Sequence, residues 1–245
     1  MPRRVVAFVG ELLLTVGILI LLYLAYSLWF TNVAAQQATV VSADRFLEQV
    51  QAQIDQAIEP SPEHVTSSEP AVTSPHAGEA STPTEPPAPF VPVEPFALLY
   101  IPRLQSDVWA EPLVEGIYYR ALASGVGHYP TTEMPGEVGN FAIAGHRATN
   151  GEPFARFERL EAGDKVYVQS LDGWFEYELV KDKIVQEDEV WVLADSPQGQ
   201  GFAPGSKLIT LTTCDPRWNS YQRWVWWGEL VATYPLDEAP IEVKR

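Results

Sequence analysis

Residues Lys207–Arg223 read KLITLTTCDPRWNSYQR and contain Cys214, the single cysteine of the 245-residue chain. β-Favouring residues alternate over 208–213, and this period of two predicts a strand with one buried side. Asp215 and Pro216 then end the strand. Cys214 is therefore expected at the last strand position, where a rigid sheet aims a side chain into a loop-lined groove.

A candidate partner for the thiol follows nine residues later, where Arg223 opens the apolar run Trp224–Trp227. A guanidinium stays charged, so beside a thiol it lowers the thiol pKa and can donate hydrogen bonds to a developing oxyanion. The structural alternative is that a lone cysteine simply packs in the core.

A nucleophilic cysteine also needs a base, and His146 is the preferred candidate. It follows the apolar run Asn140–Ala144, so it ends a predicted strand as Cys214 does. The alternative, His128, lies in a turn and is expected to form loop hydrogen bonds. Cys214, His146 and Arg223 together suit acyl transfer through thiolate attack, amine protonation and oxyanion stabilisation.

Residues 96–245 have the composition of a folded domain, with short strand-like runs separated by Gly, Pro, Asp and Asn. This pattern predicts an all-β barrel or sandwich. Short helices are expected at 153–160 and 120–125. The predicted strands cover 98–104, 108–114, 140–144, 165–169, 174–185, 189–194, 207–212 and 224–234.

The first 33 residues are predicted to be a short cytoplasmic start and a transmembrane anchor. Leu12–Phe30 is almost wholly apolar and long enough to cross a bilayer as a helix. Arg3 and Arg4 precede it, which predicts a cytoplasmic amino terminus and an extracellular catalytic domain. A cleaved signal peptide with small residues at Val33–Ala35 is the alternative, but the apolar core is longer than such peptides use.

Two segments are predicted between this anchor and the domain. Residues 34–58 are expected to form a membrane-proximal stalk, because Phe46, Val50, Ile54 and Ile58 make a stripe on a helix. The stripe is narrow, so a weak self-association helix and a solvated spacer are the alternatives. Residues 59–95 contain ten prolines and no Lys or Arg, which predicts a disordered, extended linker.

The charge and cysteine content exclude several classes of partner. The net charge is −16, and residues 94–245 contribute −10 of it. Nucleic acid is therefore not an expected partner, since phosphate binding needs a basic face. One cysteine cannot form an intrachain disulfide, and its spacing to the four histidines does not match a zinc site. No metal or other cofactor is predicted.

Three motifs in this order resemble the sortase family. Thr210–Cys214 is similar to the Thr-Leu-x-Thr-Cys signature of sortases, Ala144–Arg147 to the segment that bears their catalytic histidine, and Arg223 to the arginine that starts their last strand. More narrowly, 127–131, 135–141 and the anchor beginning at 10–13 resemble class E sortases of high-GC Gram-positive bacteria.

The resemblance implies a closed eight-stranded sortase-type β-barrel that carries a cysteine transpeptidase. Cys214 would be the nucleophile, His146 the general acid and base, and Arg223 the oxyanion and substrate clamp. Such enzymes cut a sorting signal between Thr and Gly, hold the acyl group as a thioester, and transfer it to an amine of a cell-wall precursor. The implied partners are exported proteins with a carboxyl-terminal sorting signal, the peptidoglycan precursor and the lipid bilayer.

For class E the implied signal is Leu-Ala-x-Thr-Gly, and the residue matching Tyr129 is linked to the preference for Ala over Pro. A tyrosine hydroxyl in a groove can bond a substrate N–H that proline lacks. Thr212 and Thr213 are expected to shape the same groove. For Tyr129 the alternative is core packing beside Pro130, and packing is also the default for Thr213.

Other functions remain open at this stage. A pilin-polymerising, class C-like sortase would join protein to protein, but such enzymes carry an Asp-Pro-aromatic lid and 59–95 contains no Asp. A non-catalytic, surface-anchored binding module would not need Cys214, His146 and Arg223 together. Wall cross-linking cysteine enzymes of another fold carry a His-Gly motif shortly before the cysteine, which this chain lacks.

Overall fold

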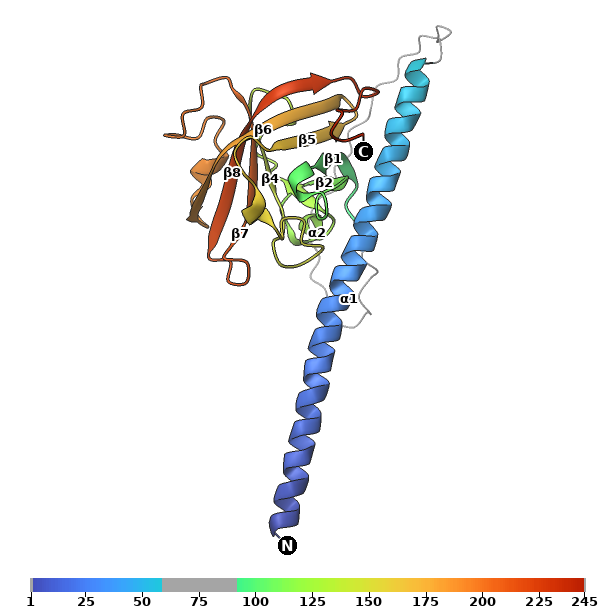
Figure 1. Cartoon of the computed structure of the whole chain (residues 1–245), viewed down its shortest axis with the longest axis vertical. Coiled ribbons are helices and arrows are strands. Elements are labelled where there is room, and N and C mark those ends of the chain that lie inside the picture. The colour runs from blue at the N-terminus through green and yellow to red at the C-terminus, as the bar shows by residue number, and fades with distance from the viewer. Residues whose placement is uncertain (1, 59–91, 245) are drawn as a thin grey trace, which may run out of the picture.

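The computed structural model describes residues 2–58 and 92–244, which form one long helix and a closed β-barrel (Figure 1). In the described residues the barrel has eight strands in the order β1-β2-β3-β4-β7-β8-β6-β5. The β2–β3 and β4–β7 pairs are parallel and the other six are antiparallel, so the barrel is mixed. The predicted closed eight-stranded barrel is thereby confirmed.

The strands differ in length, and the two longest carry much of the barrel wall. Their bounds are β1 Pro95–Tyr100, β2 Glu111–Glu115, β3 Val126–His128, β4 Gly139–Ala144, β5 Lys165–Ser170, β6 Gly173–Gln186, β7 Lys207–Asp215 and β8 Gln222–Tyr234. The helical pieces are α1 Pro2–Ile58, α2 Tyr119–Leu122, and the 3-10 turns η1 Pro102–Leu104, η2 Phe157–Arg159 and η3 Val190–Leu193.

Two of the predicted elements differ from the structure. The run 189–194 is not a strand but contains η3, whose Val192 packs with Val225 and Trp227 on the outside of the barrel. The missing strand is β3, which has only three residues and is too short to show alternation. The helix predicted over 153–160 is reduced to the single turn η2.

The barrel interior is filled by apolar side chains from most of its strands. Ile209 and Leu211 on β7 point inward with Trp226 on β8, and Phe154 and Phe157 close the same core near η2. Because side chains alternate along a strand, the neighbours of these residues point out of the barrel. This alternation decides which residues of β7 and β8 can meet a substrate.

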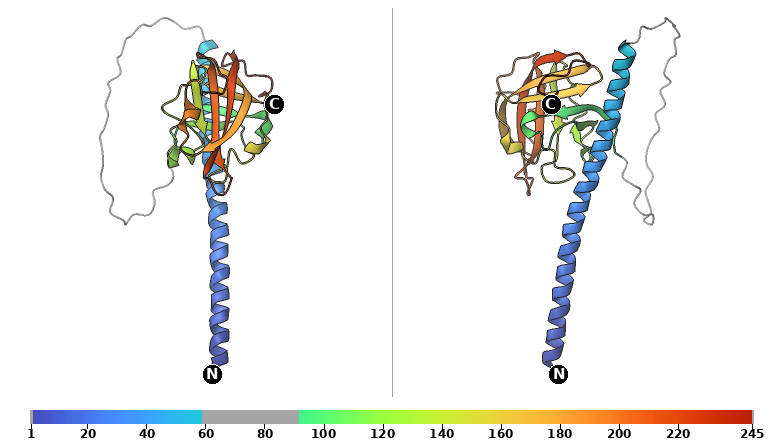
Figure 2. Two further views of the ribbon diagram at one scale, coloured as in Figure 1. Left: turned by 90° about the vertical axis from the view of Figure 1, so that its left-hand side faces the viewer. Right: turned by 45° about the vertical axis from the view of Figure 1, so that its right-hand side comes forward.

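Helix α1 runs beside the barrel for its last part and extends away from it toward the amino terminus (Figures 1 and 2). The extended part exposes apolar side chains, including Leu13 and Leu21, which are 66% and 67% exposed. The predicted span Leu12–Phe30 lies in this part of the helix. Within the residues that the structure describes, however, we find no helix that combines the length and apolar character needed to span a membrane.

The end of α1 packs on the outer face of the barrel. Phe46 and Val50 are 2% and 5% exposed and form a second core with Leu98, Tyr100 and Trp174 of the sheet. Ile54 and the carboxyl-terminal residues Leu236, Ala239 and Val243 pack against this cluster. The stripe predicted for a stalk or for self-association is therefore used within the chain, because the barrel presents an apolar outer patch that it covers. Of the predicted linker 59–95, residues 59–91 lie outside the described part.

Candidate active site

The site is built where β4, β7 and β8 lie side by side. Cys214 on β7 is directly opposite Arg223 on β8 in the antiparallel register. On the other side, β4 runs parallel to β7, and Ala144 is opposite Thr212. His146 follows two residues later, so the ends of two parallel strands bring His146 and Cys214 to the same rim of the barrel.

Hydrogen bonds continue this alignment past the end of β4. The Gly145 N–H donates to the Thr212 carbonyl at 3.1 Å, and the Thr213 hydroxyl donates to the Gly145 carbonyl at 2.8 Å. Gly145 also has no room for a side chain, because a Cβ there would lie 2.6 Å from the Phe154 ring. The residue before His146 is thus fixed against the two residues before Cys214.

A groove of about 270 Å³ lies on the outer face of the barrel beside Arg223. Directly opposed residues of an antiparallel pair point to the same face, so Cys214 and Arg223 share this outward side. The apolar wall comes from the end of β6, from the loop after it and from β8, and Tyr129 and Thr212 complete the lining on the β7 side. The wall residues are Val185, Val190, Val192, Leu193 and Val225.

Arg223 is half-buried and already has partners. Its Nη1 donates to the carbonyl oxygens of Ser220 and Gln222, both at 2.8 Å. Its Nη2 forms an exposed ion pair with Glu187 at 3.3 Å. An ion pair this exposed contributes little energy. A substrate in the groove can therefore replace Glu187 as the partner of Nη2, while the carbonyls of Ser220 and Gln222 keep the guanidinium in place.

His146 is half-buried, and burial lowers its pKa below the ordinary value of 6.5. Its Nε2 lies 3.1 Å from the side-chain amide of Asn150. An amide nitrogen can only donate, so Nε2 accepts this bond and the neutral ring carries its proton on Nδ1. Asn150 was not identified from the sequence; its spacing of four residues from His146 is the signal that could have suggested it.

The predicted substrate-binding residues divide between two sides of β7. The hydroxyls of Tyr129 and Thr212 are 3.1 Å apart at the groove. Burial raises the pKa of Tyr129, while the bond to Thr212 and the positive charge of Arg223 oppose this effect. Thr213 differs from its prediction: it is 3% exposed, bonds Gly145 and does not line the groove, because it points to the opposite side from Cys214.

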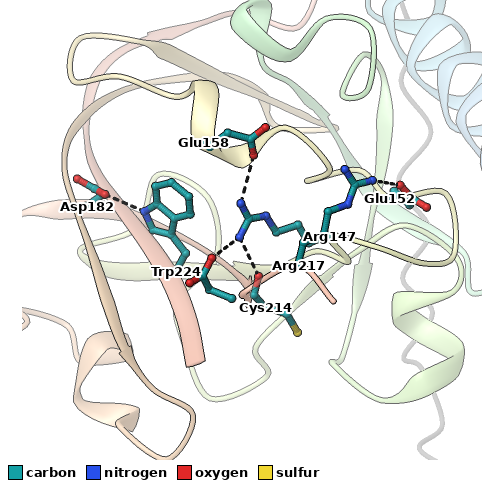
Figure 3. Close-up of polar contacts among 8 residues, drawn as sticks. Arg147, Glu152, Glu158, Asp182, Cys214, Arg217 and Trp224 are labelled. Carbon is teal, nitrogen blue, oxygen red and sulfur yellow. Dashed lines mark hydrogen bonds and ion pairs between the residues drawn. The ribbon is translucent and has the colours of Figure 1, made fainter. Parts of the chain in front are cut away.

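Behind Cys214 lies a buried cation that the sequence did not single out. Arg147 is 8% exposed, and its Nη1 donates to the Asp215 carboxylate and, at 3.4 Å, to the Cys214 carbonyl (Figure 3). Its Nη2 donates to Glu158 at 3.2 Å, and the guanidinium lies 5.1 Å from the Trp224 ring centre. The sulfur of Cys214 points away from this cation (Figure 3).

His128 is structural, as expected of the less favoured histidine, but it is the last residue of strand β3 and does not lie in a turn. It is 2% exposed, its Nδ1 lies 2.8 Å from Glu115, and its ring packs on Phe141. Among the described residues, no group of three or more His, Cys, Asp or Glu side chains is arranged to hold a metal ion. What this rim offers is a half-buried thiol, an imidazole and a guanidinium, the groups of a cysteine acyltransferase.

The chain that carries this arrangement matches a known protein family. The family model of the sortase domain matches residues 99–231, which is more than half of the chain. The protein belongs to the sortase family of cysteine transpeptidases.

Its relatives include class E sortases. Sortase SrtE1 of Streptomyces coelicolor is 34% identical over 94% of this chain and 58% of its own length, so the chain spans little more than half of that protein. Sortase SrtE2 of the same organism is 30% identical over 96% of this chain and 85% of its own. The crystal structure of S. coelicolor sortase E1 with a tripeptide in its active site is 37% identical, covers 61% of this chain and 95% of its own, and has a TM-score of 0.56.

Proposed function

We propose that this protein is a class E-type sortase that cleaves a Leu-Ala-x-Thr-Gly sorting signal between Thr and Gly and transfers the acyl fragment to a cell-wall precursor amine. The observation that carries the proposal is the strand register, which opposes Cys214 and Arg223 beside the segment that bears His146. The similarity to class E sortases supports the choice of signal.

The first half of the reaction forms a thioester. The thiolate of Cys214 attacks the threonine carbonyl carbon, and the developing oxyanion accepts hydrogen bonds from Arg223. The bond to the glycine nitrogen breaks as the His146 imidazolium gives that nitrogen its proton. The amine product leaves, and the upstream protein remains bound to Cys214 as a thioester.

The second half transfers the acyl group. The neutral ring of His146 takes a proton from the incoming amine as its nitrogen attacks the thioester carbonyl. The carbon–sulfur bond breaks and returns the thiolate and the imidazolium. Water in place of the amine gives hydrolysis, so the apolar wall beside Val192 and Val225 favours transfer by limiting water.

The contact between Tyr129 and Thr212 supports the preference for Ala in the signal. The Thr212 hydroxyl donates to the Ile143 carbonyl, so the Tyr129 hydroxyl is the donor to Thr212 and keeps free lone pairs that can accept a substrate N–H. Proline at that signal position has no N–H and would leave the buried acceptor unpaired. Rejecting a substrate that lacks a required hydrogen bond is the most effective kind of discrimination.

The test uses the full-length chain in detergent, a Leu-Ala-x-Thr-Gly peptide and a small amine, with product masses read by mass spectrometry. Wild type is expected to give the amine-linked fragment, and Cys214→Ala no product. Undiminished cleavage by Cys214→Ala, or none by wild type, rejects the proposed function. A peptide with Pro in place of Ala is expected to react more slowly, and Tyr129→Phe tests whether that difference depends on the hydroxyl.

We also propose that the first part of α1 anchors the enzyme in the cell membrane, with the amino terminus in the cytoplasm and the barrel outside. The support is the apolar run Leu12–Phe30 behind Arg3 and Arg4, together with the exposed leucines of this helix. The chain is expected to stay in the membrane fraction after alkaline carbonate washing. Release by that wash would reject the anchor.

A further inference from the structure

We propose that Arg147 is the positioning residue that sets the geometry of the active site from behind. The inference rests on the roles proposed for Cys214, His146 and Arg223, and it assigns a task to a buried cation that those roles do not use. Its contacts form the network drawn in Figure 3.

Arg147 lies next to, or contacts a neighbour of, each proposed catalytic residue. It follows His146 directly in the chain, it binds Asp215, which follows Cys214, and it lies against Trp224, which follows Arg223. One guanidinium therefore joins the immediate neighbours of all three proposed catalytic residues. It also binds the carbonyl of Cys214 itself at 3.4 Å.

Side chains alternate between the two faces of β7 and β8. Cys214 and Arg223 point out to the groove side, so the next residue along each strand points to the other side. Asp215 and Trp224 are thus on the side where Arg147 lies. Fixing these two residues fixes the strand ends, and through them the directions in which the thiol and Arg223 point.

Burial of the Arg147 guanidinium costs free energy, which its partners must offset. A guanidinium that is 8% exposed has lost most of its water, and that cost is offset only by well-placed partners. Arg147 has them in Asp215, whose side chain is 16% exposed, and Glu158, which is 50% exposed. A planar fork can serve a carbonyl and two carboxylates at once, which a lysine ammonium cannot do in the same geometry.

The position of Asp215 adds an electrostatic consequence. Without Arg147, the Asp215 carboxylate would lose this ion pair beside Cys214, the residue that must carry a thiolate. A negative charge next to a thiol disfavours the thiolate. Arg147 is therefore expected to affect both the placement of the sulfur and the pH at which it reacts.

The test compares Arg147→Met, Arg147→Lys and the matched control Arg217→Met in the full-length chain. Arg217 is three residues beyond Cys214. Its ion pair is with Glu152 (Figure 3) and its ring contact is with Trp218, so these interactions go to residues other than the neighbours named above. Three quantities are measured for each variant: kcat and KM with the sorting peptide, the pH dependence of iodoacetamide alkylation of Cys214, and the melting temperature.

Arg147→Met is expected to lower kcat by about 100-fold with KM within about twofold, the loss typical of a displaced reacting group. Its alkylation midpoint should move to higher pH. Arg147→Lys should keep the midpoint near that of wild type, since the charge remains, while kcat recovers only in part. Arg217→Met should resemble wild type in both kcat and the alkylation midpoint.

Wild-type kcat and alkylation profile in folded Arg147→Met, or equal losses in Arg217→Met, would overturn the inference. If Arg147→Met does not fold, Arg147→Lys decides, and wild-type kcat in that variant overturns it. Alkylation needs no substrate, so it separates this inference from the proposed function. A shifted midpoint supports the role of Arg147 even if the wild-type protein does not cleave the peptide.

Discussion

At the scale of the residue, His146 is controlled by its burial and by one neighbour. Burial lowers its pKa, and the amide of Asn150 donates to its Nε2. Both effects favour the neutral ring, because a protonated Nε2 could not accept that bond. The imidazolium that protonates the leaving amine is therefore the minor form at neutral pH.

On the acid side, kcat/KM is therefore expected to fall with a midpoint below pH 6.5, and this fall is the acid limb. Asn150→Ala should move the midpoint to higher pH by roughly 0.5–1 unit. The shift corresponds to the loss of one hydrogen bond of about 1 kcal/mol to the neutral ring. Asn219→Ala, a change of the same kind at an exposed position of the loop after β7, should leave the limb unchanged. A limb at or above pH 6.5 in wild type would contradict this account.

Glu111 on β2 gives a second prediction at this scale. Burial raises its pKa from the ordinary 4.5 to about 8. Between these values the folded chain keeps a proton that the unfolded chain has released, so stability falls as pH rises from about 4.5 to about 8. The residue as a whole is partly buried and keeps some contact with solvent, which reduces the size of the effect.

Glu111→Gln is expected to raise the melting temperature at pH 8.5 and to leave it nearly unchanged at pH 4.5. Glutamine cannot ionise, so the cost of a buried carboxylate disappears. The matched control is Glu238→Gln, which makes the same change at an exposed position. An equal gain at both pH values, or in the control, would show that the charge of Glu111 is not the cause.

At the scale of the element, α1 changes its surroundings along its length. Its amino-terminal part exposes apolar side chains, and its last four turns cover Tyr100, Tyr167 and Trp174 on the barrel. Gln53 of this part also donates to the Leu171 carbonyl at 2.9 Å. The docked part is therefore a structural component of the barrel domain.

Phe46→Ala is expected to lower the free energy of unfolding by about 3 kcal/mol, since it removes a buried ring from the contact between helix and barrel. Leu47→Ala is the matched control: Leu47 is the next residue and is 37% exposed, so its loss should be small. The two variants are compared by urea unfolding followed through tryptophan fluorescence. Equal stability of both would mean that α1 does not stay docked.

At the scale of the whole molecule, α1 has two segments with different positions relative to the barrel. The amino-terminal part of α1 extends beyond the barrel (Figure 2), and the segment from Ala43 to Ile54 packs on it. Glu94, just before β1, lies at the same surface, and its carboxylate pairs with Arg45 at 3.6 Å.

Deletion of residues 2–39 is expected to leave the melting temperature of the barrel nearly unchanged. Deletion of residues 2–58 should lower it by several degrees, because the apolar patch around Tyr100 and Trp174 then faces water. Binding of a fluorescent hydrophobic dye, which reports exposed apolar surface, should rise only in the longer deletion. The same melting temperature for both would show that the helix adds no stability to the barrel.

Much of this molecule was determined by its sequence. Alternation over β7, the stop at Asp215 and the order of the three motifs were enough to predict the barrel and to select Cys214, His146 and Arg223 for one rim. These features are local, because a strand shows its period and its end within a few residues. The sequence also contained the stripe around Phe46, although not the surface that it covers.

The tertiary structure alone decided the pairing of strands and what lies behind them. The three-residue β3, the turn η3 in place of a strand, and the different sides of Thr212 and Thr213 depend on contacts between distant segments. The same is true of Arg147, which looks like an ordinary polar residue in the chain. Its role arises only when folding buries it beside Asp215 and Trp224, far away in the sequence, because burial and the partners present decide how strongly a polar side chain interacts.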